Sequence, residues 1–108
     1  NYFYQVSQEA IYLNHSDNNF IIGNEIRRSG LYTDNTYSAI YLKNNSYHNI
    51  INSNIIISDG TYHIKYGILE EDLGTDENII TSNIIGLAGT DGIQIQGSNT
   101  ILANNLVY

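Results

Sequence analysis

A spaced motif of asparagine and isoleucine, N-x-I-x-x-N-x-I, constrains this 108-residue chain more than any other feature. The motif is complete at residues 49–56 and recurs three more times, with Leu as the last letter of the fourth copy. The four copies begin at Asn19, Asn49, Asn78 and Asn99. Self-similarity at a period of about 20 to 50 residues is typical of proteins built from stacked supersecondary units. The repeat therefore predicts a solenoid.

A second phrase, a small residue followed by Ile, precedes each copy of the motif at a variable distance. It starts at residues 10, 39, 67 and 92, so that successive coils are 29, 28 and 25 residues long. Most of this variation is expected in three return segments, which are residues 29–38, 58–66 and 86–91. Insertions at one point of a repeat project from one face of a solenoid, and that face is often the binding face.

The residue types indicate strands. Ile is abundant, Tyr supplies 10 of the 12 aromatic residues, and Pro, Met, Trp and Cys are absent. β-Branched and aromatic residues suit a pleated, half-buried surface. Because successive side chains of a strand point to opposite faces, alternation predicts four inward columns, spaced about 4.8 Å from coil to coil. They are Ile11, Ile40, Ile68 and Ile93; Leu13, Leu42 and Ile95; Ile21, Ile51, Ile80 and Ile101; and Ile26, Ile56, Ile85 and Leu106.

The asparagines of the motif are predicted to be structural. A stack of Asn at a bend can pass hydrogen bonds from coil to coil and satisfy amides that a tight turn leaves unpaired. One such stack is expected at Asn24, Asn54, Asn83 and Asn104, and a second at Asn19, Asn49, Asn78 and Asn99.

The termini are expected to continue the solenoid. Residues 1–9 are predicted to be the end of a preceding coil or an N-terminal cap. The chain opens on Asn and closes on Val107-Tyr108 without a polar cap. Since repeat arrays need capped ends to stay soluble, we expect flanking coils of the same parent chain, or another chain, to cover the ends.

The excess of acidic over basic residues limits the kinds of partner that the chain is expected to bind. A formal net charge of −7, with only four Lys and Arg residues, argues against nucleic acid, which requires clustered basic side chains. No apolar run is long enough to span a bilayer, so membrane insertion is not expected.

The pairing of G-I-x-I or A-I-x-L with N-x-I-x-x-N-x-I, over residues 10–108, resembles the parallel β-helix repeat of the pectin-lyase-like superfamily. The resemblance implies an all-β fold: a single-stranded right-handed parallel β-helix of about four coils, with three short sheets, forming a segment of a longer helix. The composition is also similar, more weakly, to tailspike and appendage proteins of phages, which implies a homotrimer.

The resemblance implies three alternative functions, because fold does not decide function. The first is a rigid β-helix module of an extracellular, cell-surface or virion protein that presents loops to a polysaccharide or cell-surface glycan. The second is a polysaccharide lyase or glycoside hydrolase. The third is a structural spacer.

Candidate catalytic residues for the enzymatic alternative are Glu70, Asp72 and Asp91, because glycosidases use pairs of carboxylates. Glu70 occupies the column held elsewhere by Leu13 and Leu42, and a bulge that turns Glu70 outward, with Leu73 filling the gap, is the favoured explanation. No cofactor is required, although Asp72, Asp76 and Glu77 form a candidate Ca²⁺ site of hard oxygen ligands.

Candidate sugar-binding residues combine aromatic rings with carboxylates, which suit the apolar faces and hydroxyl edges of sugars. Tyr12 and Tyr41 are predicted to align on the outward face of the first strand, followed by Leu69 and Gln94. Others lie in or next to the return segments, namely Tyr32, Tyr37, Tyr62, Tyr66, Asp34 and Asp59. An equally acceptable explanation is that these tyrosines only cover the solenoid or contact another chain.

Overall fold

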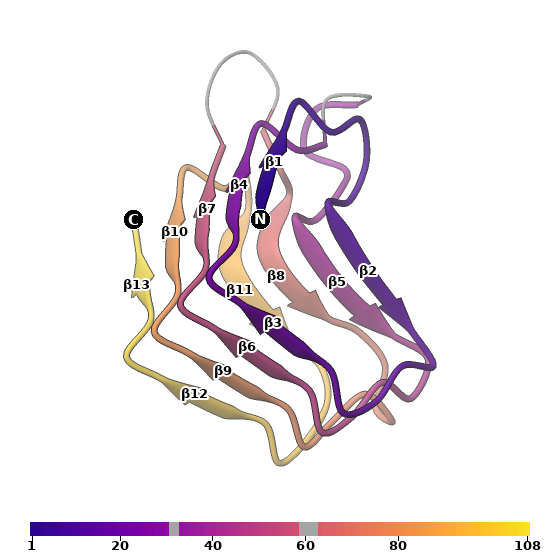
Figure 1. Ribbon diagram of the computed structural model, residues 1–108. Coiled ribbons are helices and arrows are strands. Elements are labelled where there is room, and N and C mark those ends of the chain that lie inside the picture. The colour runs from indigo at the N-terminus through magenta and orange to yellow at the C-terminus, as the bar shows by residue number, and fades with distance from the viewer. Residues whose placement is uncertain (31–32, 59–62) are drawn as a thin grey trace.

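The computed structural model describes residues 1–30, 33–58 and 63–108. These residues form thirteen short strands and no helix (Figure 1). All strand pairs are parallel, and the strands assemble into three sheets that surround one apolar interior. Among the described residues, no helix is long and apolar enough to cross a membrane.

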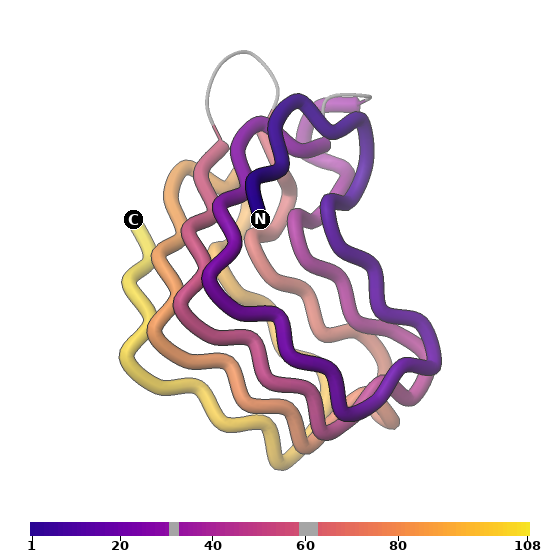
Figure 2. Tube along the Cα trace, viewed as in Figure 1, coloured from indigo at the N-terminus to yellow at the C-terminus, as the bar shows by residue number. Residues whose placement is uncertain are grey.

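Each coil contributes one strand to each sheet, in the same order. The first sheet contains β2 (Ile11–Asn14), β5 (Ile40–Lys43), β8 (Tyr66–Glu70) and β11 (Asp91–Ile95). The second contains β3 (Phe20–Ile22), β6 (Ile50–Asn52), β9 (Ile79–Thr81) and β12 (Ile101–Ala103). The third contains β1 (Tyr2–Tyr4), β4 (Glu25–Arg27), β7 (Ile55–Ile57), β10 (Ile84–Gly86) and β13 (Leu106–Val107). Figure 2 shows the successive coils following one another along the solenoid axis.

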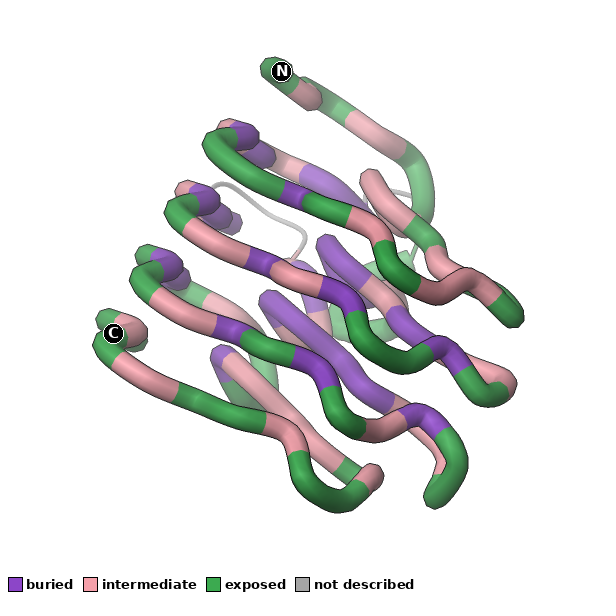
Figure 3. Tube along the Cα trace, turned by 60° about the horizontal axis from the view of Figure 1, so that its bottom comes forward, coloured by how far each residue is buried: buried purple, intermediate pink, exposed green. Residues whose placement is uncertain are grey.

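The expected aliphatic columns form the core. Ile21, Ile51 and Ile80 are in register in the second sheet, and Ile26, Ile56 and Ile85 are in register in the third. All six side chains are buried, as is Ile40 of the first sheet. Along β4, β6 and β7 the buried residues alternate with more exposed ones (Figure 3). The prediction of inward isoleucine ladders is confirmed for the first three coils.

The fourth coil differs from the prediction by one residue in two of its strands. Leu102, not Ile101, pairs with Ile80, and Val107, not Leu106, pairs with Ile85. A slip of one residue moves every side chain of a strand to the opposite face. Ile101 therefore continues an outward column. The tandem Asn104-Asn105 made either register possible in the sequence, and the hydrogen bonds of the ladder select one.

Single residues in the left-handed backbone region make the bends. Between the second and third sheets these are Gly23, Ser53, Ser82 and Asn104, with φ between 55° and 66°. The asparagine ladder follows at the next position, as Asn24, Asn54, Asn83 and Asn105. Residues of this backbone conformation also precede the other ladder, at Asn18, His48, Glu77 and Asn99. The predicted ladder positions Asn99 and Asn104 are therefore wrong, because both residues make the bend itself.

The side-chain amides of Asn54 and Asn83, in the middle of the ladder, are fully used. The Asn54 Oδ1 accepts from the backbone N–H of Asn24 at 2.9 Å and from the Asn24 Nδ2 at 3.0 Å. Its Nδ2 donates to the carbonyl of Ile21 and to the Oδ1 of Asn83. Two donor and two acceptor interactions exhaust the capacity of a primary amide. The chain of hydrogen bonds joins the coils at a buried bend, where water cannot pair the backbone.

The small residue of the second phrase also has a steric cause. Gly67 and Gly92 are the second residues of β8 and β11, and each lies close to an inward side chain of the third sheet. A Cβ on Gly67 would overlap Ile85, and a Cβ on Gly92 would overlap Val107. Alanine is accommodated at the equivalent buried position of the second coil, Ala39.

Replacement of Ile51 by Asp is expected to unfold the chain. Ile51 has no exposed surface, and an unpaired carboxylate there would cost about 3–5 kcal/mol or more, comparable to the whole stability of a small domain. Thermal melting followed by circular dichroism measures the loss. The control Ile50→Asp, one residue away on the outward side of the same strand, should melt near the wild type; equal losses for both variants would contradict the inward ladder.

Replacement of Asn54 by Ala is expected to cost about 2–4 kcal/mol, because it leaves the backbone N–H of Asn24 buried without a partner and removes the side-chain hydrogen bonds to Asn24 and Asn83. Urea titration measures the free energy of unfolding. Asn52→Ala serves as the control, since the side chain of Asn52 bonds to the hydroxyls of Thr81 and Ser53 on the outward face and not to buried backbone groups. A cost for Asn54→Ala no larger than for Asn52→Ala would show that the ladder does not hold the coils together.

Candidate functional site

The outward face of the first sheet carries a stack of tyrosines. Tyr12 and Tyr41 are in register, and Leu69 and Gln94 continue the column. The rings of Tyr12 and Tyr41 are stacked, with centroids 5.1 Å apart and an interplanar angle of 23°. Because each ring covers a face of the other, the open aromatic surface lies mainly on Tyr12, which is 50% exposed.

Charged side chains flank Tyr41. Its hydroxyl donates to the carboxylate of Glu71, and the ammonium of Lys43 lies 5.9 Å from the ring centroid. Burial, the hydrogen bond to Glu71 and the charge of that carboxylate raise the pKa of Tyr41 above its ordinary value. Tyr41 therefore keeps its proton and acts as a hydrogen-bond donor.

Two asparagines extend this surface along the strands. Asn14 is paired with Lys43 in the first sheet, two residues beyond Tyr12. The Nδ2 of Asn44 donates to the Oδ1 of Asn14 at 2.8 Å. Asn14, Lys43 and Asn44 are not among the predicted sugar-binding residues. The alternation of the strand contained the signal for the first two, since each follows an outward Tyr by two residues.

The acidic segment after β8 forms part of the corner between the first and second sheets. The carboxylate of Asp72 accepts from the backbone N–H of Asn44 at 3.0 Å. Asp76 accepts from the hydroxyl of Ser98 at 3.3 Å, and Glu77 lies 2.6 Å from the Nε2 of His48. The three predicted Ca²⁺ ligands thus contact three different groups. In the described part of the chain, no three His, Asp or Glu side chains gather as a metal site would require.

Glu70 is inside the solenoid, contrary to the expected bulge. It pairs in register with Leu42 and Ile95 in the regular first sheet, and its side chain is completely buried. Leu73, which was expected to fill the gap, is 85% exposed. The prediction of an outward Glu70 is therefore wrong. The interior at this corner is polar rather than aliphatic, so a carboxyl group can be accommodated without a change of register.

Glu70 is paired by groups of its own coil and the next one. The Nδ2 of Asn78 donates to it at 2.9 Å, and the hydroxyl of Thr100 contacts its oxygens at 2.8 Å and 2.9 Å. Burial raises the pKa of the Glu70 carboxyl, and these donors together with the backbone N–H of Gly97 oppose the rise, whereas Asp76 adds to it. Since Glu70 has no exposed surface, it cannot touch a polymeric substrate in this conformation.

Asp91, the third catalytic candidate, lies at the start of β11, at the opposite end of the paired strands from Glu70. It is exposed and borders a hollow at the last coil, which is lined by apolar residues that include Ile93, Leu102 and Val107. In the first sheet Asp91 is paired with Tyr66. Among the described residues that line this hollow, Asp91 is the only one with a carboxylate side chain. The paired carboxylates expected of a hydrolase are therefore not found at this hollow.

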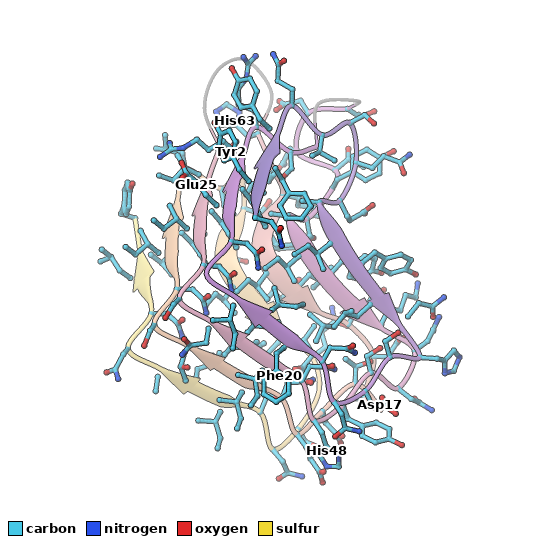
Figure 4. The ribbon with its side chains drawn as sticks, in the orientation of Figure 1. Tyr2, Asp17, Phe20, Glu25, His48 and His63 are labelled. Carbon is cyan, nitrogen blue, oxygen red and sulfur yellow. The ribbon has the colours of Figure 1, made fainter. Side chains whose placement is uncertain are left out.

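The return segments place further candidate residues beside the first sheet. The backbone N–H of His63 donates to Asp34 at 2.6 Å, and this bond holds the pKa of the Asp34 carboxyl below its ordinary value. Lys65 lies over the ring of Tyr66 at 5.2 Å, and its backbone N–H donates to the carbonyl of Tyr37. Figure 4 shows His63 on the opposite side of the view from His48 and Asp17. Tyr32, Asp59 and Tyr62 lie outside the described residues.

The contribution of Glu70 to stability is expected to depend on pH. Because its pKa is raised in the folded state, its contribution is fully present below the unfolded pKa and is lost as pH rises through the folded pKa. We expect Glu70→Gln, which never ionises, to gain stability relative to the wild type as the pH is raised from the ordinary glutamate pKa of about 4 toward neutral.

Urea titrations of both proteins across this range measure the difference. Glu71→Gln removes the neighbouring carboxylate, which is not fully buried, and serves as the control. If the Glu70→Gln and wild-type curves run parallel at all pH values, the interior does not disfavour the ionised carboxyl.

The comparison with known families agrees with this geometry. A family model described as a right-handed beta helix region matches residues 1–108, which is the whole chain. No curated protein and no solved structure matches the chain significantly. Three parallel sheets, one strand from each in every coil, and a match over the full length lead to one conclusion: the chain belongs to the right-handed β-helix family.

Proposed function

We propose that the chain is a rigid module of an extracellular, cell-surface or virion protein and that it presents one face to a polysaccharide. The observation that carries the proposal is the exposed ring of Tyr12, stacked on Tyr41 on the outward face of the first sheet. An exposed aromatic ring fixed by a neighbour offers an apolar platform to the C–H face of a sugar at a low entropic cost.

Polar groups around the stack supply hydrogen bonds for sugar hydroxyls. Asn14 and Asn44 lie beyond Tyr12 and Tyr41 along the strands, and Lys43 and Glu71 lie next to Tyr41. Amide, ammonium and carboxylate groups together provide both donors and acceptors. The tyrosines and these polar side chains follow one another from coil to coil along the solenoid axis, so a linear glycan could contact successive coils.

The charge of the module favours neutral or amino-sugar polymers. The chain carries a formal net charge of −7, and Glu71 and Asp72 lie at the edge of the proposed site. A polyuronate would be repelled by this field. The same reasoning weighs against the lyase alternative, whose substrates are uronates.

Glycan-array binding by the purified chain, followed by calorimetry with the best glycan, tests the proposal. We expect Tyr12→Ala to weaken binding about tenfold or more, as the loss of a stacking contact of 1.4 kcal/mol or more would require. Tyr37→Ala reports whether the return segments contribute.

The matched control is Tyr2→Ala. Tyr2 is also exposed and stacked on a second tyrosine, Tyr4, with ring centroids 6.0 Å apart, but on the third sheet. Failure to bind any glycan, or equal losses for Tyr2→Ala and Tyr12→Ala, would overturn the proposal. Release of new reducing ends or of unsaturated uronates during the same incubations would establish the enzymatic alternative instead.

A further inference from the structure

A second face of the solenoid is apolar on the outside as well as the inside. In the second sheet the outward column consists of Phe20, Ile50, Ile79 and Ile101, which are in register. Phe20 is 71% exposed and Ile101 is 55% exposed. The third sheet adds Ile55 and Ile84 on the other side of the bend. We call the outward side of these two sheets, including these six residues, the uncharged face; Figure 4 labels Phe20 on β3.

Charged residues are excluded from this face in three of the four coils. Residues 50–57, 79–86 and 101–107 contain no Asp, Glu, Lys or Arg, although the chain has 15 such residues. In the first coil the charges on the two sheets are those of Glu25 and Arg27, which pair with each other at 2.5 Å. The acidic residues lie instead in the return segments, on the first sheet and at its corner with the second sheet.

This pattern departs from that of a sheet that faces water. A solvated sheet face normally alternates apolar residues inside with polar residues outside. Here β7 reads Ile-Ile-Ile, with aliphatic residues at both outward positions, and β9 reads Ile-Ile-Thr, with the aliphatic Ile79 and the uncharged Thr81 outward. Contiguous exposed apolar surface of this kind marks an interaction site or an aggregation risk in soluble proteins.

We propose that the uncharged face binds a second copy of this chain, with the two solenoids side by side. The formal net charge of −7 is carried by the remaining surface, so close contact between two copies through that surface would bring acidic side chains together. The uncharged face allows close contact between copies without desolvation of carboxylates. A partner therefore has to recognise this face through apolar contacts rather than through charged groups.

The spacing of the face selects the same partner. Its side chains repeat at the separation of paired strands, about 4.8 Å, so that ridges and grooves alternate along the axis. A second copy brings the same repeat and can set its ridges into these grooves over several coils at once. Self-complementary patches of this kind form the isologous interfaces of symmetric oligomers.

Analytical ultracentrifugation of the chain tests this interface. We expect reversible self-association, and we expect the double variant Ile50→Lys with Ile79→Lys to weaken it about 100-fold or more, as for buried central interface residues. Both side chains point outward, so the variant should retain the wild-type circular dichroism spectrum and cooperative melting. Single variants at each position provide a second measurement if the double variant is unstable.

Controls distinguish this face from other routes of association. Gln94→Lys introduces the same charge on the outward side of the first sheet and should leave association unchanged. Val107→Lys introduces it at the edge strand β13, where copies could stack end to end. A chain that stays monomeric at high concentration, or association that Val107→Lys abolishes and the Ile50 and Ile79 variants do not, would overturn the proposal. Binding to phosphatidylcholine vesicles by a monomeric chain would overturn it in favour of a lipid partner.

Discussion

The structure depends on how it satisfies the backbone at its bends. A solenoid coil of three short strands must turn sharply three times, and a sharp turn leaves N–H and C=O groups without ladder partners. In this chain a residue in the left-handed region makes the bend between the second and third sheets, and an asparagine follows it at once. The side chain of Asn54, for example, donates to the carbonyl of Ile21 in the previous coil, and its backbone N–H donates to the side chain of Asn83 in the next coil. The aliphatic ladders add burial, but without the amides each bend would bury several unpaired polar groups, at about 1–3 kcal/mol each.

The corner between the first and second sheets shows how the same scheme tolerates variation. The ladder there runs from Asn19 through Asn49 to Asn78 and then ends on Thr100, whose hydroxyl replaces the amide oxygen. The hydroxyl of Thr100 accepts from the backbone N–H of Asn78, whereas the Nδ2 of Asn78 donates to Glu70 of the first sheet. Ser46 and Thr75 add buried hydroxyls at the same corner. A carboxyl group that looked out of place in an aliphatic column is thus the acceptor for a ladder that has lost one member.

The solenoid separates two kinds of surface because its sheets face different directions. The first sheet and its corner with the second carry the tyrosine stack, the polar row and most of the acidic side chains, and we have proposed this side for glycan binding. The second and third sheets present aliphatic side chains with no charge in coils two to four. In both proposals, rigid cross-coil hydrogen bonding allows short strands to hold side chains in fixed rows. The two surfaces are independent, so a copy bound to one leaves the other accessible.

The sequence by itself determined the architecture, because a repeat of apolar and amide positions must be stacked in register to bury the former and satisfy the latter. It predicted the inward isoleucines, the asparagine stacks of the first three coils and the alignment of Tyr12 with Tyr41. It could not decide the register of the fourth coil, where Asn104 and Asn105 are adjacent and only the hydrogen bonds to Asn83 select the second. Nor could it place Glu70, since a buried carboxyl group is acceptable only beside donors, and these come from Asn78 and Thr100, 8 and 30 residues further along the chain. Periodicity reports what every coil shares, whereas the exceptions depend on contacts between particular coils, and only the tertiary structure brings those together.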